Sequence, residues 1–379
     1  MKIPFCKPFL TGRESGEIGK ALAGLHLSGD GPYTQRCQGW LEAKIGCRKA
    51  LLTQSCTAAL EMAAILCNIG PGDEVIVPSF TFSSTANAFV LRGATPVFVD
   101  IRPDTLNIDE RLLEGAITPR TKAIAVVHYA GVACEMDAIL EIARRHRLRV
   151  IEDAAQAIGS QYRGRPLGGF GDVAALSFQQ TKNIVCGEGG ALLINAPDLV
   201  ERAEIVWEKG TNRRKFYRGE VDKYTWVDIG SSYLPSEVTA AFLWAQLEAE
   251  REINERRLHA WNAYHERLSP DAGSLGFSMP VIPPHCGHNA HIYYVLLRDL
   301  ETRTRLMRDL SVAGISAVFH YVPLHTSPAG RRFGRTHGEL PVTDRVADTL
   351  LRLPLWVGVD EYADLVTGEL KASLGRASR

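Results

Sequence analysis

Short apolar runs alternate with helical stretches between about residue 50 and residue 195 of the chain. The runs lie at Val75–Phe80, Thr95–Ile101, Ala123–Tyr129, Arg149–Asp153, Val173–Phe178 and Gly190–Ile194. This alternation predicts an α/β fold, with a mainly parallel sheet between helices. The runs are nearly continuous in apolar character, which is typical of strands covered on both sides. Ligands bind beyond the carboxyl ends of such strands, so the residues that follow each run are site candidates.

Two helices stand out beside these runs. Residues Thr57–Cys67 are apolar on almost every face, which predicts a buried helix whose N-terminus points inward. Ser236 is expected to cap a long helix that continues to Leu268 and becomes strongly charged in its second half. We expect this long helix to link two domains.

The C-terminal part of the chain shows a second pattern. Strand-like runs at His291–Leu297 and Ile315–Val322, followed by helical segments, predict a smaller α+β domain. The sequence therefore predicts a large domain of residues 1–245, with the linking helix and a small C-terminal domain in residues 246–379.

Composition and charge restrict the possible partners. The 379 residues are 45% hydrophobic, and 43 basic residues balance 43 acidic ones, so no global field attracts nucleic acid or a membrane surface. No apolar run approaches the roughly 18 residues of a membrane span, and the N-terminus lacks the apolar stretch of a secretory signal. Eight cysteines are scattered without a CxxC pair. We expect a cytoplasmic protein with reduced thiols.

Polar residues follow two of the predicted strands. Asp153 ends the run Arg149–Asp153, and Gln156 comes three residues later. The carboxylate of Asp153 is suited to keep a pyridinium nitrogen protonated, and Gln156 to donate to a ring oxygen. Read alone, Asp153 is equally well explained as the cap of a following helix.

Lys182 follows the next predicted strand, directly ahead of the glycine-rich turn Gly187–Gly190. Its amine would lie at the ligand edge of the sheet, where it is suited to form a Schiff base and to move protons. A lone lysine near a loop is more often a solvated surface charge.

An anion site is predicted at the start of the buried helix. Cys56 and Thr57 offer free backbone N–H groups at the positive end of the helix dipole, and Ser177 could add a hydroxyl. A plain N-cap by Ser55 or Thr57 is the alternative. Phe80 or Phe82 could stack on a ring, although an aromatic residue there is more often core.

A lysine, an acid, a phosphate cradle and a ring neighbour are together what pyridoxal phosphate requires. The segments that carry them are SCTAALEMA, VPSFTFSSTANAFVLRGATPVFVDI, IEDAAQAIGS and SFQQTKN followed by GEGG. In this order they resemble the sugar aminotransferases of the DegT/DnrJ/EryC1 type, a branch of the fold type I pyridoxal phosphate enzymes. The resemblance runs through nearly the whole chain.

The resemblance implies a role for each candidate residue. It makes Lys182 the Schiff-base lysine, Asp153 the pyridinium partner and Gln156 the neighbour of the ring oxygen. It makes Ser177 a phosphate ligand, Cys56 and Thr57 the amide cradle, and Phe82 the stacking ring. Pyridoxal 5'-phosphate would alternate with pyridoxamine 5'-phosphate as the amino group is taken up and passed on.

Two positions depart from residues common in the family. Gln179 stands where many relatives have His, and Leu234 where they have an Asn that reaches the cofactor phosphate of the partner subunit. Ser231 or Ser232 is expected to take over that contact. The resemblance thus implies a homodimer whose interface completes each site.

A basic segment, Thr211–Lys223, suits the diphosphate of a nucleotide sugar, although it also fits a solvated loop. Aromatic residues beside cations suit a sugar nucleotide, because such a ligand has apolar faces as well as charge. The predicted substrate contacts are Arg213, Lys223, Tyr224, Trp226, His320 and Tyr321. Longer segments, such as VDKYTWVDIGSSYL, most resemble those family members that use L-glutamate to aminate dTDP-4-keto-6-deoxyglucose.

Three other interpretations of the sequence have less support. Sugar dehydration at C3 occurs in relatives that carry a His in place of the lysine, and Lys182 argues against it. A non-catalytic regulator that contains the cofactor is favoured only by Gln179 and Leu234. The segment HCGHNAH imitates a metal site, but it runs into a strand whose alternate side chains face opposite ways, so we expect no metal.

Overall fold

The computed structural model describes residues 2–377, whose largest element is an eight-stranded sheet. Its strands lie in the order β1 (Lys49–Thr53), β9 (Gly190–Ile194), β8 (Val173–Ser177), β5 (Arg149–Asp153), β4 (Thr121–Val127), β2 (Glu74–Pro78), β3 (Thr95–Val99) and β13 (Arg335–Thr336). Strand β9 is antiparallel to both of its neighbours, whereas the other pairs are parallel. The predicted mainly parallel sheet is confirmed, with β9 as its reversed strand.

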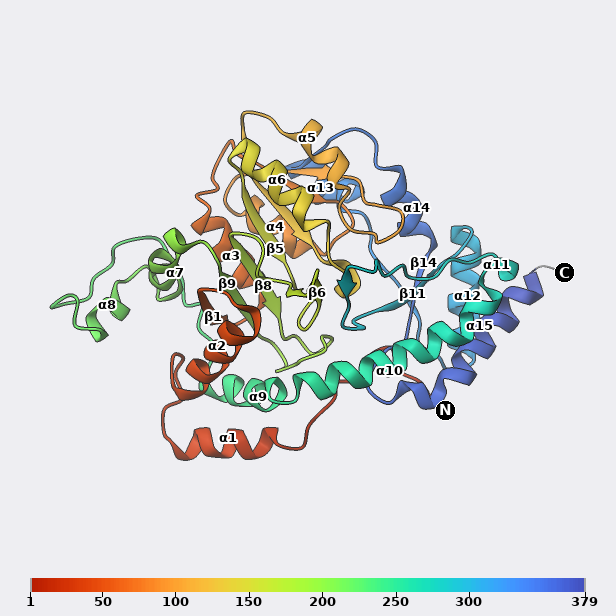
Figure 1. Ribbon diagram of the computed structural model, residues 1–379, viewed down its shortest axis with the longest axis horizontal. Coiled ribbons are helices and arrows are strands. Elements are labelled where there is room, and N and C mark those ends of the chain that lie inside the picture. Colours follow the sequence, from red (N-terminus) through yellow and green to blue (C-terminus); the bar gives the residue numbers. More distant parts are fainter. Residues whose placement is uncertain (1, 378–379) are drawn as a thin grey trace.

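Helices cover both faces of this sheet, as Figure 1 shows. One face packs against α2 (Pro32–Ile45), α6 (Met136–His146) and α9 (Glu237–Leu247), and the other against α3 (Cys56–Leu66), α4 (Ser83–Val90) and α7 (Val200–Trp207). Successive strand residues serve opposite cores: Leu52 faces the first group of helices and Leu51 the second. Helix α1 (Glu14–Ala23) packs on the outer side of α9.

The helix that follows Ser236 differs from its prediction. Ser236 caps it as expected, since its hydroxyl accepts a hydrogen bond from the Thr239 N–H at 3.2 Å. The predicted single helix is instead two, α9 and α10 (Glu250–Leu268), because the backbone leaves the helical conformation at Ala249. Figure 1 shows α9 beneath the large sheet and α10 continuing toward the C-terminal part of the molecule.

The C-terminal part has its own antiparallel sheet and its own core. The sheet contains β11 (Tyr293–Leu296), β14 (Leu350–Leu353) and β12 (Val318–Phe319), in that order. Helices α10, α12 (Leu300–Val312) and α15 (Ala363–Ala377) enclose the core on one side of it. This separate core supports a division near residues 245 and 246, which remains a prediction.

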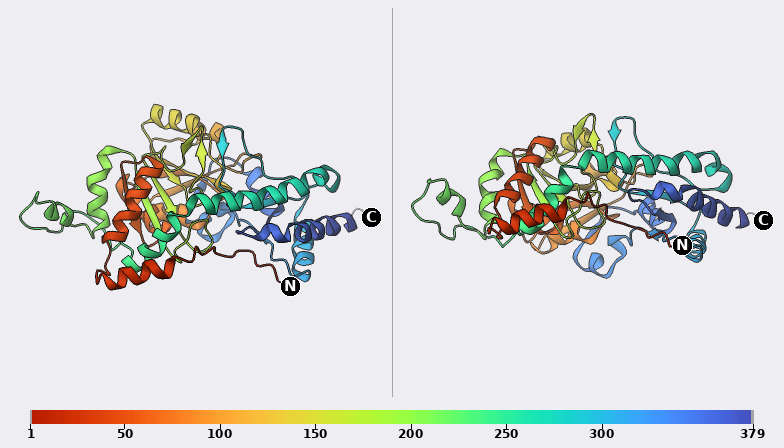
Figure 2. Two further views of the ribbon diagram at one scale, coloured as in Figure 1. Left: turned by 60° about the horizontal axis from the view of Figure 1, so that its bottom comes forward. Right: turned by 90° about the horizontal axis from the view of Figure 1, so that it is seen from below.

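Two connections cross the predicted division. Ile3 forms a parallel bridge with Ile315, and β13 extends the large sheet beside β3. Both views of Figure 2 show the N-terminus lying against the C-terminal part. The remaining α-helices and strands are α5 (Leu113–Ala116), α8 (Arg213–Tyr217), α11 (Ala272–Leu275), α13 (Pro328–Phe333), α14 (Pro341–Thr349), β6 (Gln161–Tyr162), β7 (Arg165–Pro166) and β10 (Cys286–Gly287). None of the helices within residues 2–377 is long and apolar enough to cross a membrane.

Candidate active site

A cavity of about 520 Å³ lies at the carboxyl edge of the large sheet, where β4, β5 and β8 end. It brings together most of the residues that the sequence singled out. These are Cys56, Thr57, Phe82, Asp153, Gln156, Ser177, Lys182, His320 and Tyr321. The last two come from the C-terminal part, so the cavity lies where that part meets the large sheet.

Asp153 is the last residue of β5, and its side chain is buried at the cavity wall. Oδ2 accepts a hydrogen bond from the Thr85 hydroxyl at 2.7 Å, and Oδ1 accepts one from the Ala155 N–H at 3.1 Å. Burial raises the pKa of Asp153, although both hydrogen bonds oppose that effect. Residues 154–160 form turns, so the alternative that Asp153 caps a following helix is wrong.

Lys182 lies in the turns after β8 and lines the cavity. Among residues 2–377 its amine has neither a hydrogen-bond acceptor nor an ion-pair partner. Its position in the cavity and its burial argue against the alternative of an ordinary surface charge. Burial lowers the pKa of Lys182, nearby Arg352 lowers it further, and Cys56 and Asp153 oppose the effect. A lowered pKa increases the share of neutral amine, which is the nucleophilic form.

The start of α3 forms the floor of the cavity. Ser55 is the N-cap residue, and its hydroxyl accepts the Ala58 N–H at 3.1 Å. The N–H groups of Cys56 and Thr57 belong to the first turn and have no acceptor within the helix, so they are available to an anion. A Cβ on Gly190 would lie 2.4 Å from the Ser55 carbonyl carbon. Glycine therefore lets β9 approach this helix end.

The two aromatic candidates occupy different places. Phe80 is 1% exposed and packs edge-on against Tyr129 and Tyr321, so it belongs to the core. Phe82 is 62% exposed and lines the cavity as the N-cap residue of α4. Of these two residues, Phe82 is therefore the one placed to lie against a bound ring.

Gln156 links the edge of the large sheet to the C-terminal part of the cavity wall. Its side-chain carbonyl accepts the Ala130 N–H at 2.7 Å, and its amide donates to the Tyr321 hydroxyl at 3.1 Å. The neighbouring His320 Nδ1 lies 3.1 Å from the Tyr129 hydroxyl. These contacts fix the position of residues 320 and 321 over the sheet edge.

The sequence analysis missed several residues at or beside the cavity. Phe5 lines it from the N-terminal segment and Arg352 from β14, and Thr85 of α4 contacts Asp153 from behind the cavity wall. His291, which the sequence offered only as part of a segment that imitates a metal site, also lines the cavity ahead of β11. A signal existed for one of them, since Arg352 interrupts the apolar run LLRLPL. The others come from segments whose approach depends on tertiary packing.

The remaining predicted residues lie elsewhere in this chain. They are Arg213, Lys223, Tyr224, Trp226, Ser231 and Ser232. Their segment extends outward beyond α7, and α8 stands at the left margin of Figure 1. Tyr224 is 53% exposed and Trp226 77% exposed. Within one chain these residues do not line the Lys182 cavity.

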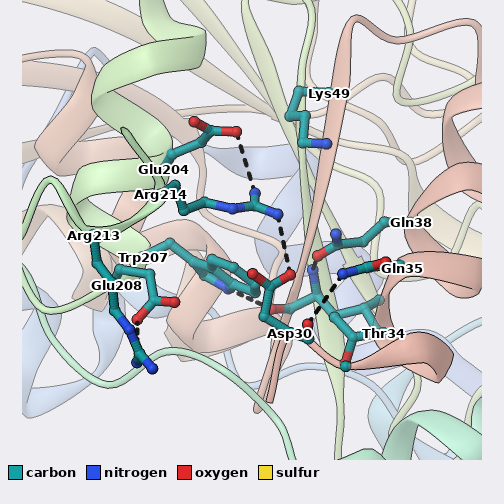
Figure 3. A network of polar contacts seen from close by, with 12 residues as sticks. Asp30, Thr34, Gln35, Gln38, Lys49, Glu204, Trp207, Glu208, Arg213 and Arg214 are labelled. Carbon is teal, nitrogen blue, oxygen red and sulfur yellow. Dashed lines mark hydrogen bonds and ion pairs between the residues drawn. The ribbon is translucent and has the colours of Figure 1, made fainter. Parts of the chain in front are cut away.

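A second cavity, of about 790 Å³, lies at the base of this segment and includes Arg213, Ser232 and Leu234. Figure 3 shows the ion pairs within it. Arg214 binds Asp30 at 3.0 Å and Glu204 at 3.2 Å. The segment's positive charge is thus largely neutralised in the chain itself, although Lys223 forms no ion pair with any described residue.

A lysine cavity at the carboxyl edge of a mainly parallel sheet, beside a smaller C-terminal sheet, defines a fold type I pyridoxal-phosphate-dependent enzyme. The model of the DegT/DnrJ/EryC1/StrS aminotransferase family matches residues 10–370. The chain therefore belongs to this family. The predicted fold, cofactor and aminotransferase activity are confirmed, against the alternatives of a dehydratase and a non-catalytic regulator.

Individual relatives match this chain over nearly its full length. The GDP-perosamine synthase of Caulobacter vibrioides is 34% identical, and the match covers 95% of each chain. The crystal structure of an aminotransferase, TlmJ, from Streptoalloteichus hindustanus is 32% identical, with a TM-score of 0.91 and full coverage of both chains. The pyridoxal phosphate form of a sugar aminotransferase from Streptococcus pneumoniae, Spr1654, is 26% identical, with a TM-score of 0.91 and 99% of each chain covered.

Proposed function

We propose that the protein transfers an amino group from L-glutamate to C4 of dTDP-4-keto-6-deoxy-D-glucose, which yields dTDP-4-amino-4,6-dideoxy-D-galactose. The observation that carries this proposal is the unpaired Lys182 amine, which shares one cavity with buried Asp153 and the free amides of α3. The names of the GDP-perosamine synthase and of the Streptococcus pneumoniae protein support a sugar substrate. The long segments that resemble a dTDP-4-amino-4,6-dideoxygalactose transaminase support the nucleotide and the product.

Each cavity residue has a proposed task. Asp153 keeps the ring nitrogen protonated, Gln156 lies beside the ring oxygen, and Phe82 covers one face of the ring. The N–H groups of Cys56 and Thr57 bind the phosphate, together with the Ser177 hydroxyl. Bound pyridoxal phosphate supplies an aldehyde that accepts the amino group and a ring that delocalises electrons.

Lys182 is proposed both to hold the cofactor and to move the proton that each half of the transfer requires. The lowered pKa of its amine suits this second task, because an efficient general base has a pKa near the working pH. Asp153 and Lys182 lie on the same cavity wall, so the acid that activates the ring and the base that moves the proton serve one bound ligand.

A homodimer is part of the proposal. His320 and Tyr321 line the cavity from within the same chain, whereas Arg213, Lys223, Tyr224, Trp226, Ser231 and Ser232 would reach the cavity of the partner. The outward extension of their segment and the exposure of Trp226 support this arrangement. In this arrangement Lys223, which lacks an ion pair among the described residues, would meet the diphosphate.

The proposal is tested by incubating the purified protein with L-glutamate and the dTDP keto sugar. We expect one 2-oxoglutarate for each amino sugar, and a small H3–H4 coupling in the NMR spectrum because the amine at C4 is axial. A large coupling would contradict the galacto configuration and leave the transfer intact. Absence of both 2-oxoglutarate and amino sugar would contradict the proposed function, and parallel reactions with GDP and UDP sugars would test the nucleotide.

A further inference from the structure

One imidazole in the cavity has no task in the proposed function. His291 lies two residues ahead of β11, and its ring lines the same cavity as Lys182. Its backbone N–H donates to the Asn289 side-chain oxygen at 3.1 Å, and its backbone carbonyl accepts a hydrogen bond from Arg257 Nη2 at 2.9 Å. The backbone of His291 is therefore held on both sides, behind the ring that faces the cavity.

The residue that follows Lys182 fixes the tautomer of this ring. Asn183 Nδ2 donates to the Asn254 side-chain oxygen at 2.9 Å and to the Asn289 carbonyl at 2.8 Å, so its Oδ1 is the atom left to accept. His291 Nδ1 lies 3.0 Å from Oδ1 and must carry the proton of this contact. All three asparagines are buried, so water does not replace these hydrogen bonds.

The other ring nitrogen, Nε2, is left as an acceptor. Burial lowers the pKa of His291 well below its usual value, and four neighbouring groups lower it further, so the ring stays neutral. These groups are Lys182, Arg257, Arg352 and His320. A neutral ring with its proton on Nδ1 has a lone pair on Nε2. Since Nδ1 points to the wall at Asn183, Nε2 points away from that wall, and it has no partner among residues 2–377.

Other side-chain acceptors that line the cavity are already engaged. The side-chain carbonyl of Gln156 accepts a backbone N–H at 2.7 Å, and that of Gln179 accepts a backbone N–H at 2.8 Å and a hydroxyl at 2.6 Å. The carboxylate of Asp153 accepts two hydrogen bonds, and Glu188 is exposed to solvent. His291 Nε2 is therefore a free acceptor in a cavity where free acceptors are scarce.

We infer that His291 Nε2 accepts a hydrogen bond from the ammonium group of Lys182 whenever that amine is released, and so positions it for proton transfer. This inference rests on the proposed function, because it gives the same reaction a further residue. The Lys182 amine is released when the donor's nitrogen takes its place, and it becomes an ammonium once it has removed the proton from the donor's α-carbon. An ammonium donates hydrogen bonds and accepts none. The proton stays on Lys182 and returns to the ligand from there, since the neutral ring only accepts a hydrogen bond.

The connection through Asn183 supports this role. One peptide bond joins Asn183 to Lys182, and one hydrogen bond joins it to the ring of His291. The ring therefore keeps a fixed place beside the segment that carries the amine. Among the neighbouring charged groups, Lys182 has the largest effect on the pKa of His291, which indicates that the two side chains lie close together.

Two substitutions of His291 separate the acceptor in the cavity from the contact with the wall. In His291→Asn the side-chain amide takes the place of Nδ1, so the hydrogen bond to Asn183 is kept and the cavity acceptor is lost. In His291→Gln the amide reaches the place of Nε2, so an acceptor remains in the cavity and the hydrogen bond to Asn183 is lost. The matched control is His259→Asn, at a ring on α10 that is 76% exposed.

The first measurement is the pKa of Lys182 in the protein loaded with pyridoxamine 5'-phosphate, in which this amine is free. Labelling with acetic anhydride at several pH values, followed by peptide mapping with mass spectrometry, gives the fraction of neutral Lys182. A hydrogen bond to the ammonium favours the charged form. The pKa of Lys182 should therefore fall in His291→Asn and change little in His291→Gln and in His259→Asn. An equal pKa in the unaltered protein and in His291→Asn, or a fall in His291→Gln alone, would overturn the inference.

The second measurement is a single turnover with L-glutamate. His291→Asn should lower the rate constant of proton transfer about 10- to 100-fold, because a reacting group that is poorly positioned reacts more slowly. The dissociation constant of L-glutamate should stay within about twofold, and His291→Gln should recover part of the rate. A loss of affinity for L-glutamate at an unchanged rate constant would show that His291 binds the donor instead, and would overturn the inference.

The two proposals fail in different ways. If the unaltered protein produced no 2-oxoglutarate from L-glutamate, the proposed function would fall, whereas the labelling would still decide whether His291 holds the ammonium. If the unaltered protein transferred the amino group and His291→Asn changed neither the pKa of Lys182 nor the rate, the inference would fall while the proposed function stood.

Discussion

At the scale of single residues, the hydrogen bond between Thr85 and Asp153 controls the charge of the cavity acid. The Thr85 hydroxyl donates to Oδ2 at 2.7 Å, and this contact lowers the pKa of Asp153 against the opposing effect of burial. The proposed role of Asp153 requires its ionised form. The activity should therefore fall as the pH drops through the pKa of this carboxyl.

Thr85→Val removes the donor and keeps the shape of the side chain. The pKa of Asp153 should then rise, so the acid limb of the kcat/KM profile should move to higher pH. Thr85→Ser retains the hydroxyl and should leave the profile in place. An unchanged acid limb in the valine variant would show that Thr85 does not control the charge of Asp153.

Only some of the site residues could be predicted from the sequence. Asp153, Lys182 and the start of α3 could be predicted because each follows a recognisable strand or opens a recognisable helix. Thr85 could not be predicted, because its importance depends on a contact between segments that are distant in sequence. Arg352 left only one local signal, a charge within the apolar run LLRLPL.

At the scale of elements, the close approach of β9 to α3 shapes the proposed phosphate site. A Cβ on Gly190 would lie 2.4 Å from the Ser55 carbonyl carbon and 2.5 Å from the Cys56 nitrogen, and both of these are backbone atoms. Gly190→Ala should therefore displace the first turn of α3 and weaken cofactor binding about tenfold or more. Fluorescence titration with pyridoxal phosphate measures this change.

Gly39→Ala is the control, because a Cβ on Gly39 in α2 meets no atom within 4 Å. It should leave cofactor affinity unchanged and stabilise the helix by up to about 1 kcal/mol. Normal affinity in Gly190→Ala would contradict the importance of this close approach.

The strand β13 is tied to the large sheet by Glu74. Arg335 donates to both carboxylate oxygens of this buried residue, and Thr118 and Arg120 add further hydrogen bonds. The Arg335 contact lowers the pKa of Glu74 to about 2. Because this pKa is depressed, the carboxylate stabilises the fold at pH values above its pKa in the unfolded chain, which is about 4.3. The contribution is lost as the pH falls toward 2.

Glu74→Gln should lower the free energy of unfolding by about 2 kcal/mol at pH 7, and the difference from the unaltered protein should shrink between pH 4 and pH 3. Urea unfolding at several pH values measures both effects. Glu141→Gln, at a carboxylate that is 53% exposed, should change little. A pH-independent difference for Glu74→Gln would show that charge is not the cause.

Element prediction succeeded where the local pattern was strong. The apolar runs identified β2, β3, β4, β5, β8 and β9, although several strands end one or two residues earlier than the runs. The pattern missed β1, which is as long as several strands that were identified, and β14, which has four residues. It also missed β13, whose two residues join the large sheet only through tertiary packing. It also joined α9 and α10, because nothing in the local sequence marks the break at Ala249.

At the scale of the whole molecule, the proposed homodimer predicts that each active site uses two chains. A Lys182→Ala dimer lacks the essential amine, and a dimer carrying Lys223→Ala and Trp226→Ala lacks the projecting contacts. Mixing the two after dissociation and reassociation should restore about a quarter of the sites, because half of the dimers are mixed and each has one intact site. The regained rate measures this complementation.

The control is to mix each variant with itself, which should restore nothing. A mixture that stayed inactive, although mass spectrometry showed mixed dimers, would contradict the shared site. Activity of the Lys223→Ala and Trp226→Ala variant on its own would contradict the proposed role of the segment.

The whole account depends on the Lys182 amine, which is unpaired among residues 2–377 and lies beside buried Asp153. The most direct measurement is borohydride reduction of the cofactor-loaded protein, followed by peptide mapping with mass spectrometry. We predict a stable pyridoxyl phosphate adduct on Lys182, which Lys182→Arg abolishes. An adduct on another lysine, or an unlabelled residue 182 in protein that demonstrably contains the cofactor, would contradict the central claim.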